Sequence, residues 1–327
     1  MAVPAGIVRY PKGMESSIQD RLSRFARHWA AVFKSAGKNW IESQAFIYAA
    51  ALAFFTVFSI APVVILIVAV LGLVLGEDTA RAELMGQLEA VMGAQAVGVV
   101  ETAITNSRIE DSGIWPTLAG LGATIVGATT VFAQMQKSLN QIWDVAPRPT
   151  RSSVWIFIKA RLLSLTMVLS IGFVLLVSLV LGVVVRAVIA HAEQWLPIPA
   201  WLMLGVEPVI SLTVVTLLFA AIFRILPDVV LRWKDVLAGA FITALLFTVG
   251  RTLIAWYLAN TAAASAYGAA GSLVLLLLWV NYSSLILLIG ASICRANLEQ
   301  QGRTIRPRNT AVRVHRELVD DDPGASR

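Results

Sequence analysis

Six apolar segments, each long enough to cross a lipid bilayer, constrain the fold of this chain more than any other feature. A helix needs about 20 apolar residues to span the hydrocarbon core. The segments comprise residues 46–75, 113–132, 162–185, 201–223, 236–259 and 271–294. The first is long for one span and contains Pro62, which predicts a tilted or kinked helix. We therefore predict an all-α, polytopic membrane helix bundle with six transmembrane helices, plus amphipathic interfacial and external helices.

The distribution of Lys and Arg between the apolar segments predicts how this bundle sits in the membrane. These residues are frequent in the N-terminal segment, in residues 133–161, in residues 224–235 and in the C-terminal tail. They are rare in residues 76–112 and 186–200, and residues 260–270 carry no charge. Cytoplasmic loops carry the excess of Lys and Arg. The alternation therefore predicts a multi-pass protein of a bacterial inner membrane, with both termini in the cytoplasm.

The apolar segments divide the chain into three parts. Residues 1–45 form a cytoplasmic segment with an amphipathic helix at 16–35, which lies on the inner membrane surface or packs on the bundle. Residues 46–294 form the transmembrane domain, in which the acidic stretch 78–107 predicts one or two external helices. Residues 295–327 form a cytoplasmic tail, which we expect to be disordered because it is rich in charge and poor in aromatic residues.

The composition excludes a soluble protein and favours lipids as partners. Hydrophobic residues make up 57% of the chain and charged residues only 14%, whereas a soluble domain carries about 25% charged residues. The net charge of +6 lies in tails and loops beside apolar segments, so it sets orientation rather than nucleic-acid binding. We predict membrane lipids, including anionic headgroups, as partners, and no nucleic acid. A homo-oligomer is compatible with the sequence.

Two charged residues lie inside predicted spans, Glu207 in the fourth and Arg251 in the fifth. A charge within the bilayer costs a few kcal/mol and often marks function. Both residues lie roughly 10–12 Å inside the outer ends of consecutive, antiparallel helices, so we predict that they pair. The pair is either structural, with snorkelling of the arginine as a variant, or a polar site that opens outward and handles an anionic headgroup.

Other polar and aromatic residues extend these predictions. Asn281 lies near the middle of the last span and needs a partner, for which Thr56 and Thr129 are candidates. Its role is either bonding between helices or contact with a substrate. Trp143 and Trp233 follow or precede spans and are predicted to anchor the protein at the lipid headgroups. Their loops are either fixed anchors or gates of an inner opening.

The sequence gives no sign of an enzyme. Its three histidines, His28, His191 and His315, lie in three separate segments, and no pair has the spacing of metal ligands. It contains neither a phosphate-binding Gly-rich loop that ends in Lys-Ser/Thr nor a Gly-x-Ser-x-Gly elbow. We therefore predict no catalytic residues, no metal site and no cofactor.

Four motifs resemble those of one protein family. They are AALAFFTVFSIAPVV at residues 50–64, FAQMQKSLNQIWDV at 132–145, ILPDVVLRWKDVLAGA at 225–240 and YGAAGSLVLLLLWVNYSSLILLIGA at 267–291. In this order they resemble the YihY/virulence factor BrkB family of bacterial inner-membrane proteins, formerly mislabelled ribonuclease BN. The resemblance covers roughly Trp40 to Ala296. Many relatives have Tyr at the position of Asn281 and Glu at the position of Ser292, so this chain departs from the family there.

Two functions fit these observations. The resemblance implies transport of a lipid-like substrate, and the charges at the level of Arg251 favour a transporter or flippase-like protein for an amphipathic, anionic lipid-like molecule. The alternative is a non-transporting membrane scaffold for an envelope assembly. A polar cavity lined by Thr56, Thr129, Asn281 and Arg251 favours transport, and a bundle packed solid through its midplane favours the scaffold.

Overall fold

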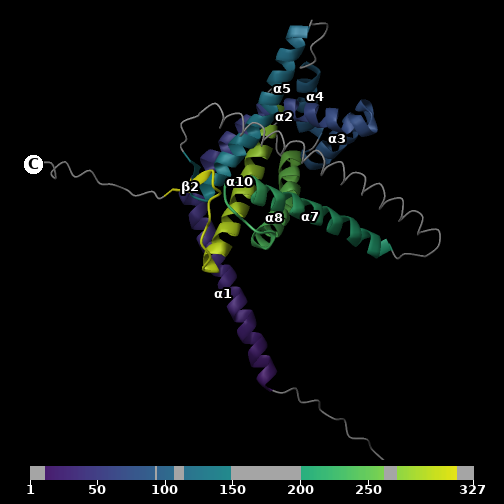
Figure 1. The fold of residues 1–327 in the computed structure, drawn as a ribbon. Helices are drawn as coiled ribbons and strands as arrows, with labels where there is room; N and C mark the ends of the chain where they lie inside the picture. Colours follow the sequence, from purple (N-terminus) through teal and green to yellow (C-terminus); the bar gives the residue numbers. More distant parts are fainter. Residues whose placement is uncertain (1–11, 93, 107–113, 149–199, 261–270, 315–327) are drawn as a thin grey trace, which may run out of the picture.

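Helices account for almost all of the chain that the computed structural model describes, namely residues 12–92, 94–106, 114–148, 200–260 and 271–314 (Figure 1). The helices are α1 (Lys12–Glu42), α2 (Ala45–Leu75), α3 (Glu77–Met92), α4 (Ala94–Asn106), α5 (Ile114–Ile142), α7 (Ala200–Ile225), α8 (Trp233–Asn260) and α10 (Gly271–Gln300). Two short strands, β1 (Val145–Pro147) and β2 (Ala311–Arg313), pair antiparallel. The helical class predicted from the sequence is therefore confirmed for the described residues.

Three helices are long and apolar enough to cross a membrane within the described part of the chain. Their spans are Ala45–Leu73 in α2, Trp233–Ile254 in α8 and Leu273–Gln300 in α10. They match the first, fifth and sixth predicted spans. α7 contains a shorter apolar stretch, Ser211–Ile225, and α5 covers the second predicted span. The predicted span 162–185 lies outside the described residues, so the count of six remains a prediction.

The bundle is centred on α2 and α10, which pack against each other (Figure 1). α5 packs along α2, α8 packs along α10, and α7 lies against α8. α2 is helical through Pro62, which faces α5. A Cβ atom added to Gly127 of α5 would lie 2.8 Å from Pro62 Cγ, so the two helices touch at this point.

Small residues bring α8 and α10 equally close. A Cβ atom on Gly239 of α8 would overlap Cys294 Sγ of α10, and one on Gly250 would overlap the Tyr282 hydroxyl. From the other side, a Cβ atom on Gly290 would overlap the Thr243 hydroxyl. Glycines at such contacts let helix backbones approach within a membrane, where association depends on packing. The α8–α10 contact is therefore determined by the absence of side chains at three positions.

The acidic stretch between the first two predicted spans, for which one or two helices are predicted, forms two. α3 and α4 pack on each other and on α2. Their apolar faces bury Leu84, Val97 and Val100, while Arg81 of α3 lies 3.9 Å from Glu101 of α4. The position of α3 and α4 outside the membrane remains a prediction.

The C-terminal half of α1 packs on the bundle. Val32 and Ala36 are buried against Ile293 and Ala296 of α10. Further toward the N-terminus, Phe25 is 64% exposed. Of the two interpretations of the amphipathic helix, packing on the bundle therefore holds for the half that contains Val32.

The first part of the C-terminal tail is ordered, contrary to the disorder predicted for residues 295–327. α10 continues to Gln300, and residues 301–314 then cross the end of the bundle to form β2. Val229 and Pro307 form an isolated β-bridge, and the Val230 amide donates to the Arg306 carbonyl at 2.9 Å. A charged sequence was expected to stay solvated, but its backbone finds hydrogen-bond partners on two other segments. Residues 315–327 lie outside the described part.

Candidate functional site

Four groups of polar side chains join six segments at one end of the bundle, and we call them together the polar layer. It connects the end of α5, the α7–α8 loop, the start of α8, the end of α10, the tail and α1. Its members are Gln136, Asn140, Asp144, Asp228, Arg232, Asp235, Arg295, Asn297, Glu299, Gln301 and Arg303, with His28 and Asn39 from α1. Three of these groups contain carboxylates.

Arg295 of α10 forms the first of these groups. Its guanidinium lies 2.7 Å from the Asp144 carboxylate and 2.8 Å from that of Glu299, and it donates to the Ile142 carbonyl at 2.5 Å. The Arg295 side chain is only 12% exposed. Ile142 ends α5, so one arginine both pairs with two acids and donates to an unsatisfied carbonyl of a helix C-terminus. This group fixes the end of α10 to the end of α5.

Asp228 of the α7–α8 loop forms the second group with two amides of α5. Its carboxylate accepts hydrogen bonds from Asn140 at 2.8 Å and from Gln136 at 3.2 Å. The Asp228 amide in turn donates to the Asn140 side-chain oxygen at 2.8 Å. The exchange uses both ends of the Asn140 side chain, so α5 and the α7–α8 loop are held in one register.

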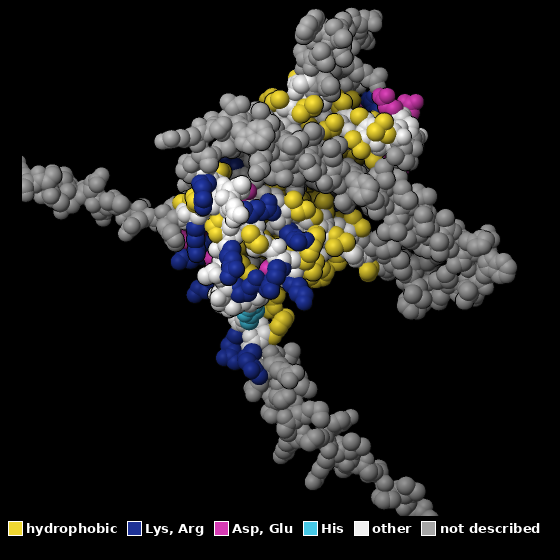
Figure 2. All heavy atoms as spheres, in the orientation of Figure 1, with side chains coloured by type: hydrophobic (Ala, Val, Ile, Leu, Met, Phe, Trp, Pro, Cys, Tyr) yellow, Lys and Arg dark blue, Asp and Glu magenta, His cyan; other side chains and the backbone are white. Residues whose placement is uncertain are grey.

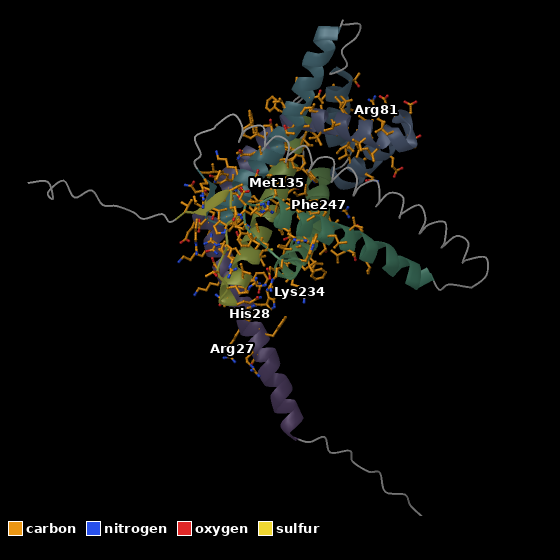
Figure 3. The ribbon with its side chains drawn as sticks, viewed as in Figure 1. Arg27, His28, Arg81, Met135, Lys234 and Phe247 are labelled. Atoms are coloured by element: carbon orange, nitrogen blue, oxygen red, sulfur yellow. The ribbon has the colours of Figure 1, made fainter. Side chains whose placement is uncertain are left out.

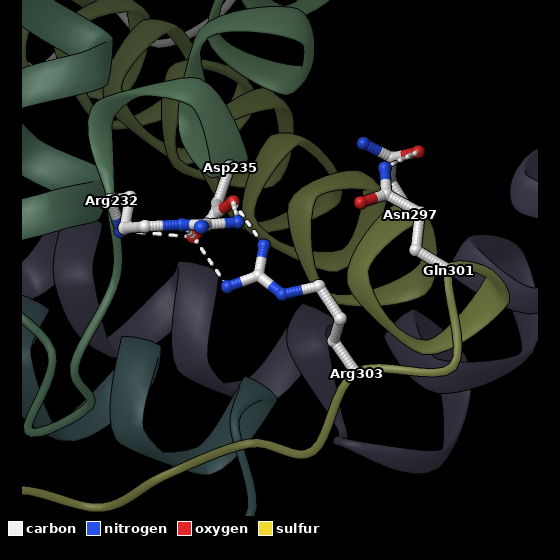
Figure 4. Close-up of polar contacts among 5 residues, drawn as sticks. All are labelled: Arg232, Asp235, Asn297, Gln301 and Arg303. Carbon is white, nitrogen blue, oxygen red and sulfur yellow. Dashed lines mark hydrogen bonds and ion pairs between the residues drawn. The ribbon is translucent and has the colours of Figure 1, made fainter.

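Asp235 in the first turn of α8 forms the third group (Figure 4). Its carboxylate accepts from the Arg232 amide at 2.9 Å, which satisfies one of the free amides at the start of the helix. The two terminal guanidinium nitrogens of Arg303, in the tail, also donate to this carboxylate. The hydrogen bond to Asp235 raises the pKa of Arg303. The tail is thus fixed to the start of α8 by a charged pair.

α1 joins the same layer through two contacts. The His28 ring lies 3.0 Å from the Asn297 side-chain oxygen, which also accepts from Gln301 at 3.2 Å. Asn39 donates to the Glu299 carboxylate at 3.4 Å. Within the described residues, no three His, Cys, Asp or Glu side chains gather as a metal site. The polar layer is therefore a set of mutually satisfied groups suited to joining segments.

Replacing Asn140 with alanine should lower the free energy of unfolding by about 2 kcal/mol. The substitution leaves the buried Asp228 amide and carboxylate short of a partner each. Thermal unfolding of the purified protein in detergent measures the effect. Asn39→Ala is the matched control, because the 3.4 Å bond of Asn39 is longer and only partly buried. Equal losses of unfolding free energy in Asn140→Ala and Asn39→Ala would contradict the proposal that the bonds of Asn140 to Asp228 stabilise the fold.

The residues predicted to line a polar site are spread over four helices. The Thr56 hydroxyl donates to the Leu52 carbonyl at 2.7 Å. The buried Thr129 hydroxyl donates to the Ile125 carbonyl, also at 2.7 Å. Each threonine is therefore satisfied within its own helix. Asn281 lies half-buried on α10.

Arg251 and Glu207 belong to neighbouring helices, as predicted. Arg251 is half-buried on α8, and α8 packs against α7, which carries Glu207. The Glu207 side chain lies outside the described ones. The pairing of these two residues therefore stays a prediction.

The two predicted tryptophan anchors differ in their surroundings. Trp143 is 1% exposed and packs in the hydrophobic core with Leu139 and Ile142, so the prediction of an anchor among lipid headgroups is wrong for it. Its face of the motif points inward, and the polar face forms the polar layer instead. Trp233 is 43% exposed at the start of α8 and stays a candidate anchor.

Sequence comparisons identify several relatives, most of which are named membrane proteins. A "ribonuclease-like protein YfkH" of Bacillus subtilis is 27% identical, over 64% of this chain and 76% of the relative. A UPF0761 membrane protein of Mannheimia succiniciproducens is 25% identical, over 75% of this chain and 82% of its own length. One of Xanthomonas axonopodis pv. citri is 26% identical, over 78% of this chain but only 58% of its own length.

The family comparison covers the whole polar layer except for His28. No solved structure matches this chain. The sequence profile described as virulence factor BrkB matches residues 36–314, which include all four motifs and the ordered part of the tail. The chain is a membrane protein that belongs to the virulence factor BrkB family.

Proposed function

We propose that this protein is a multi-pass inner-membrane transporter, or flippase-like protein, for an amphipathic, anionic lipid-like substrate. The observation that carries the proposal is Arg251, a half-buried arginine inside the membrane-spanning part of α8. It lies about two and a half turns before α8 ends at Asn260, so the helix continues well beyond it. An ionisable residue at such a depth is costly, and substrate pathways are one of the functions that such residues mark in membrane proteins.

The surroundings of Arg251 support a polar path. α8 lies between α7 and α10 and packs against both. The neighbouring Gly250 faces Tyr282 of α10, next to Asn281. Arg251 of α8 therefore lies at about the same height in the bundle as Tyr282 and Asn281 of α10, so a cation, a phenol and an amide occur close to one level. These groups suit a substrate that has an anionic headgroup and an apolar body.

Charge asymmetry supports the proposed orientation. Figure 2 shows Lys and Arg side chains gathered over one end of the molecule, and acidic side chains at the opposite end. Lys234 and His28 lie toward the first end, and Arg81 of α3 lies toward the second (Figure 3). Because Lys and Arg are retained on the inner side, we place the polar layer and both termini in the cytoplasm.

Reconstitution tests the proposal. The purified protein is placed in liposomes with fluorescent anionic and zwitterionic lipids, and transbilayer movement is followed by dithionite quenching. We expect the wild type to move the anionic lipid, and Arg251→Ala to reduce the rate at least about tenfold, as expected for loss of more than 1.4 kcal/mol of interaction. Arg251→Lys should keep part of the rate. Arg27→Ala, which removes an exposed arginine of α1, should leave it unchanged.

A non-transporting membrane scaffold is the second candidate, and close packing favours it. The contacts at Gly127, Gly250 and Gly290 leave no room for even a methyl group between the helices. No lipid movement above that of empty liposomes, with the protein folded and inserted, would overturn transport and favour the scaffold. The name "ribonuclease-like" belongs to the Bacillus relative. For this chain we propose no enzymatic activity, because its three histidines lie in separate segments.

A further inference from the structure

The turn from α7 into α8 presents positive charge next to exposed apolar side chains, and we call this surface the α7–α8 corner. It consists of Arg224, Val230, Trp233 and Lys234. Val230 is 62% exposed. Lys234 is exposed beside it, at the end of the molecule that carries the basic residues (Figures 2 and 3). The corner thus combines the two chemistries of a membrane interface.

Two arginines give the corner a defined geometry. The guanidinium carbon of Arg224 lies 4.5 Å from the centroid of the Trp233 ring, a cation–π contact that orients both side chains. Arg308 of the tail donates to the carbonyls of Arg224 and Ile225, at 3.2 and 3.1 Å. It therefore satisfies the C-terminal end of α7 and brings a further cation to the same turn.

The nearby carboxylates are already engaged. Asp235 is paired with Arg303 and Arg232, and Asp228 accepts from two amides of α5. Arg224 and Lys234 therefore keep their charge available at the surface. An anion that approaches the corner would meet two cations close to the Trp233 ring.

An apolar stripe runs from the corner along α8. Leu237, Phe241 and Leu245 are 39%, 46% and 40% exposed. Their spacing of four residues places them on one helix face, one turn apart. The stripe begins one turn after Trp233 and lies within the span Trp233–Ile254. Charge, aromatic ring and apolar stripe therefore follow in the order of headgroup, interface and acyl chain.

We propose that the α7–α8 corner binds one anionic phospholipid of the cytoplasmic leaflet. The phosphate lies between Arg224 and Lys234, the Trp233 ring sits at the interface, and an acyl chain lies along Leu237 and Phe241. Tryptophan is enriched at this level of membranes, and each basic residue near an anionic surface adds attraction. This site does not depend on transport, because a lipid can stay bound there whether or not a substrate moves.

Native mass spectrometry of the detergent-purified protein tests the site. Phosphatidylglycerol and phosphatidylcholine are titrated against the wild type and against the double variant Arg224→Ala/Lys234→Ala. We expect the wild type to bind one phosphatidylglycerol tightly and phosphatidylcholine weakly. The double variant should bind phosphatidylglycerol roughly 25-fold more weakly, since each basic residue near the surface contributes a factor of about five.

Matched variants separate a site from diffuse attraction. Lys34→Ala/Lys38→Ala removes the same charge from exposed positions of α1 and should bind phosphatidylglycerol like the wild type. Arg224→Lys/Lys234→Arg keeps both charges and should retain most of the binding. Equal weakening by both alanine pairs, or equal binding of the two lipids by the wild type, would overturn the proposal. Competition by glycerol phosphate at the affinity of the lipid would also overturn it, because the apolar stripe would then contribute nothing.

Discussion

Replacing Gly290 with alanine should lower the free energy of unfolding by about 3 kcal/mol, at the upper end of the cost of overpacking. The new methyl group would overlap the Thr243 hydroxyl and lie 2.9 Å from Phe223 Cζ. The Thr243 hydroxyl donates to the Gly239 carbonyl at 2.6 Å and is fully buried, so it has no free space into which to rotate. Helix α10, which carries Gly290, must therefore move away from α8, which carries Thr243. Thermal unfolding in detergent measures the loss.

A control and a rescue test this explanation. Gly98→Ala in α4 adds the same methyl group where no atom lies within 4 Å, and should stabilise the helix by up to about 1 kcal/mol. Adding Thr243→Ala to Gly290→Ala removes the hydroxyl and methyl groups nearest to the new Cβ atom, and should recover part of the loss. Phe223 keeps the rescue incomplete. If Gly98→Ala destabilises as much as Gly290→Ala, the loss does not come from helix contact.

Replacing Arg295 with alanine should cost about 2–4 kcal/mol of unfolding free energy. The change leaves Asp144 and Glu299 facing each other without a cation, and the Ile142 carbonyl without a donor. Removing one partner of a fully buried ion pair costs about 3–5 kcal/mol. Since the side chains of both acids are about a third exposed, the expected cost is about 1 kcal/mol below that range. Guanidine or thermal unfolding in detergent provides the measurement.

The exposed pair Lys38–Glu42 of α1 supplies the comparison. Its side chains are 73% and 61% exposed, so Lys38→Ala should change stability by less than about 0.5 kcal/mol. The stability loss of Arg295→Lys should lie between those of Arg295→Ala and Lys38→Ala. An ammonium cannot bind both carboxylates and the carbonyl in the same planar geometry. Stability of Arg295→Ala within the error of the Lys38→Ala value would contradict the role assigned to Arg295.

The helices could be predicted because their signals are local. Long apolar runs predict α2, α8 and α10 nearly to their ends. The apolar spacing in the acidic stretch predicts α3 and α4. For the amphipathic helix α1, the same pattern fits a membrane surface or another helix, so only the contact of Val32 with α10 decides between them.

The polar layer could not be predicted in the same way, because its partners are far apart in the sequence. The motif at residues 132–145 separates polar from apolar positions, but it does not show that Asn140 meets Asp228 or that Trp143 faces the core. Likewise, the charge of the tail predicts solvation. Its backbone pairing with residues 145–147 depends on complementary ends that only the folded chain brings together.

The polar site predicted from Arg251 and Glu207 can be located in the sequence, but its contacts cannot. A charge in an apolar run is visible in any sequence, and the contact of α7 with α8 makes the pairing feasible. The sequence does not show with which groups the hydroxyls of Thr56 and Thr129 form hydrogen bonds. Their hydroxyls bond to their own helices, which is the usual way to satisfy a threonine in an apolar surrounding.

The pairing of Val145 with Arg313 has a consequence for biosynthesis. Ribosomes deliver the chain from its N-terminus, so Asp144 and Asp235 are synthesised before their partners Arg295 and Arg303 exist. The earlier spans must be inserted and held while these acids remain in water. Completion of translation then joins the segments of the polar layer at this end of the bundle. The tail is the last segment to pack. A chain truncated before it would have its helices in the membrane but would lack the contacts that join their ends.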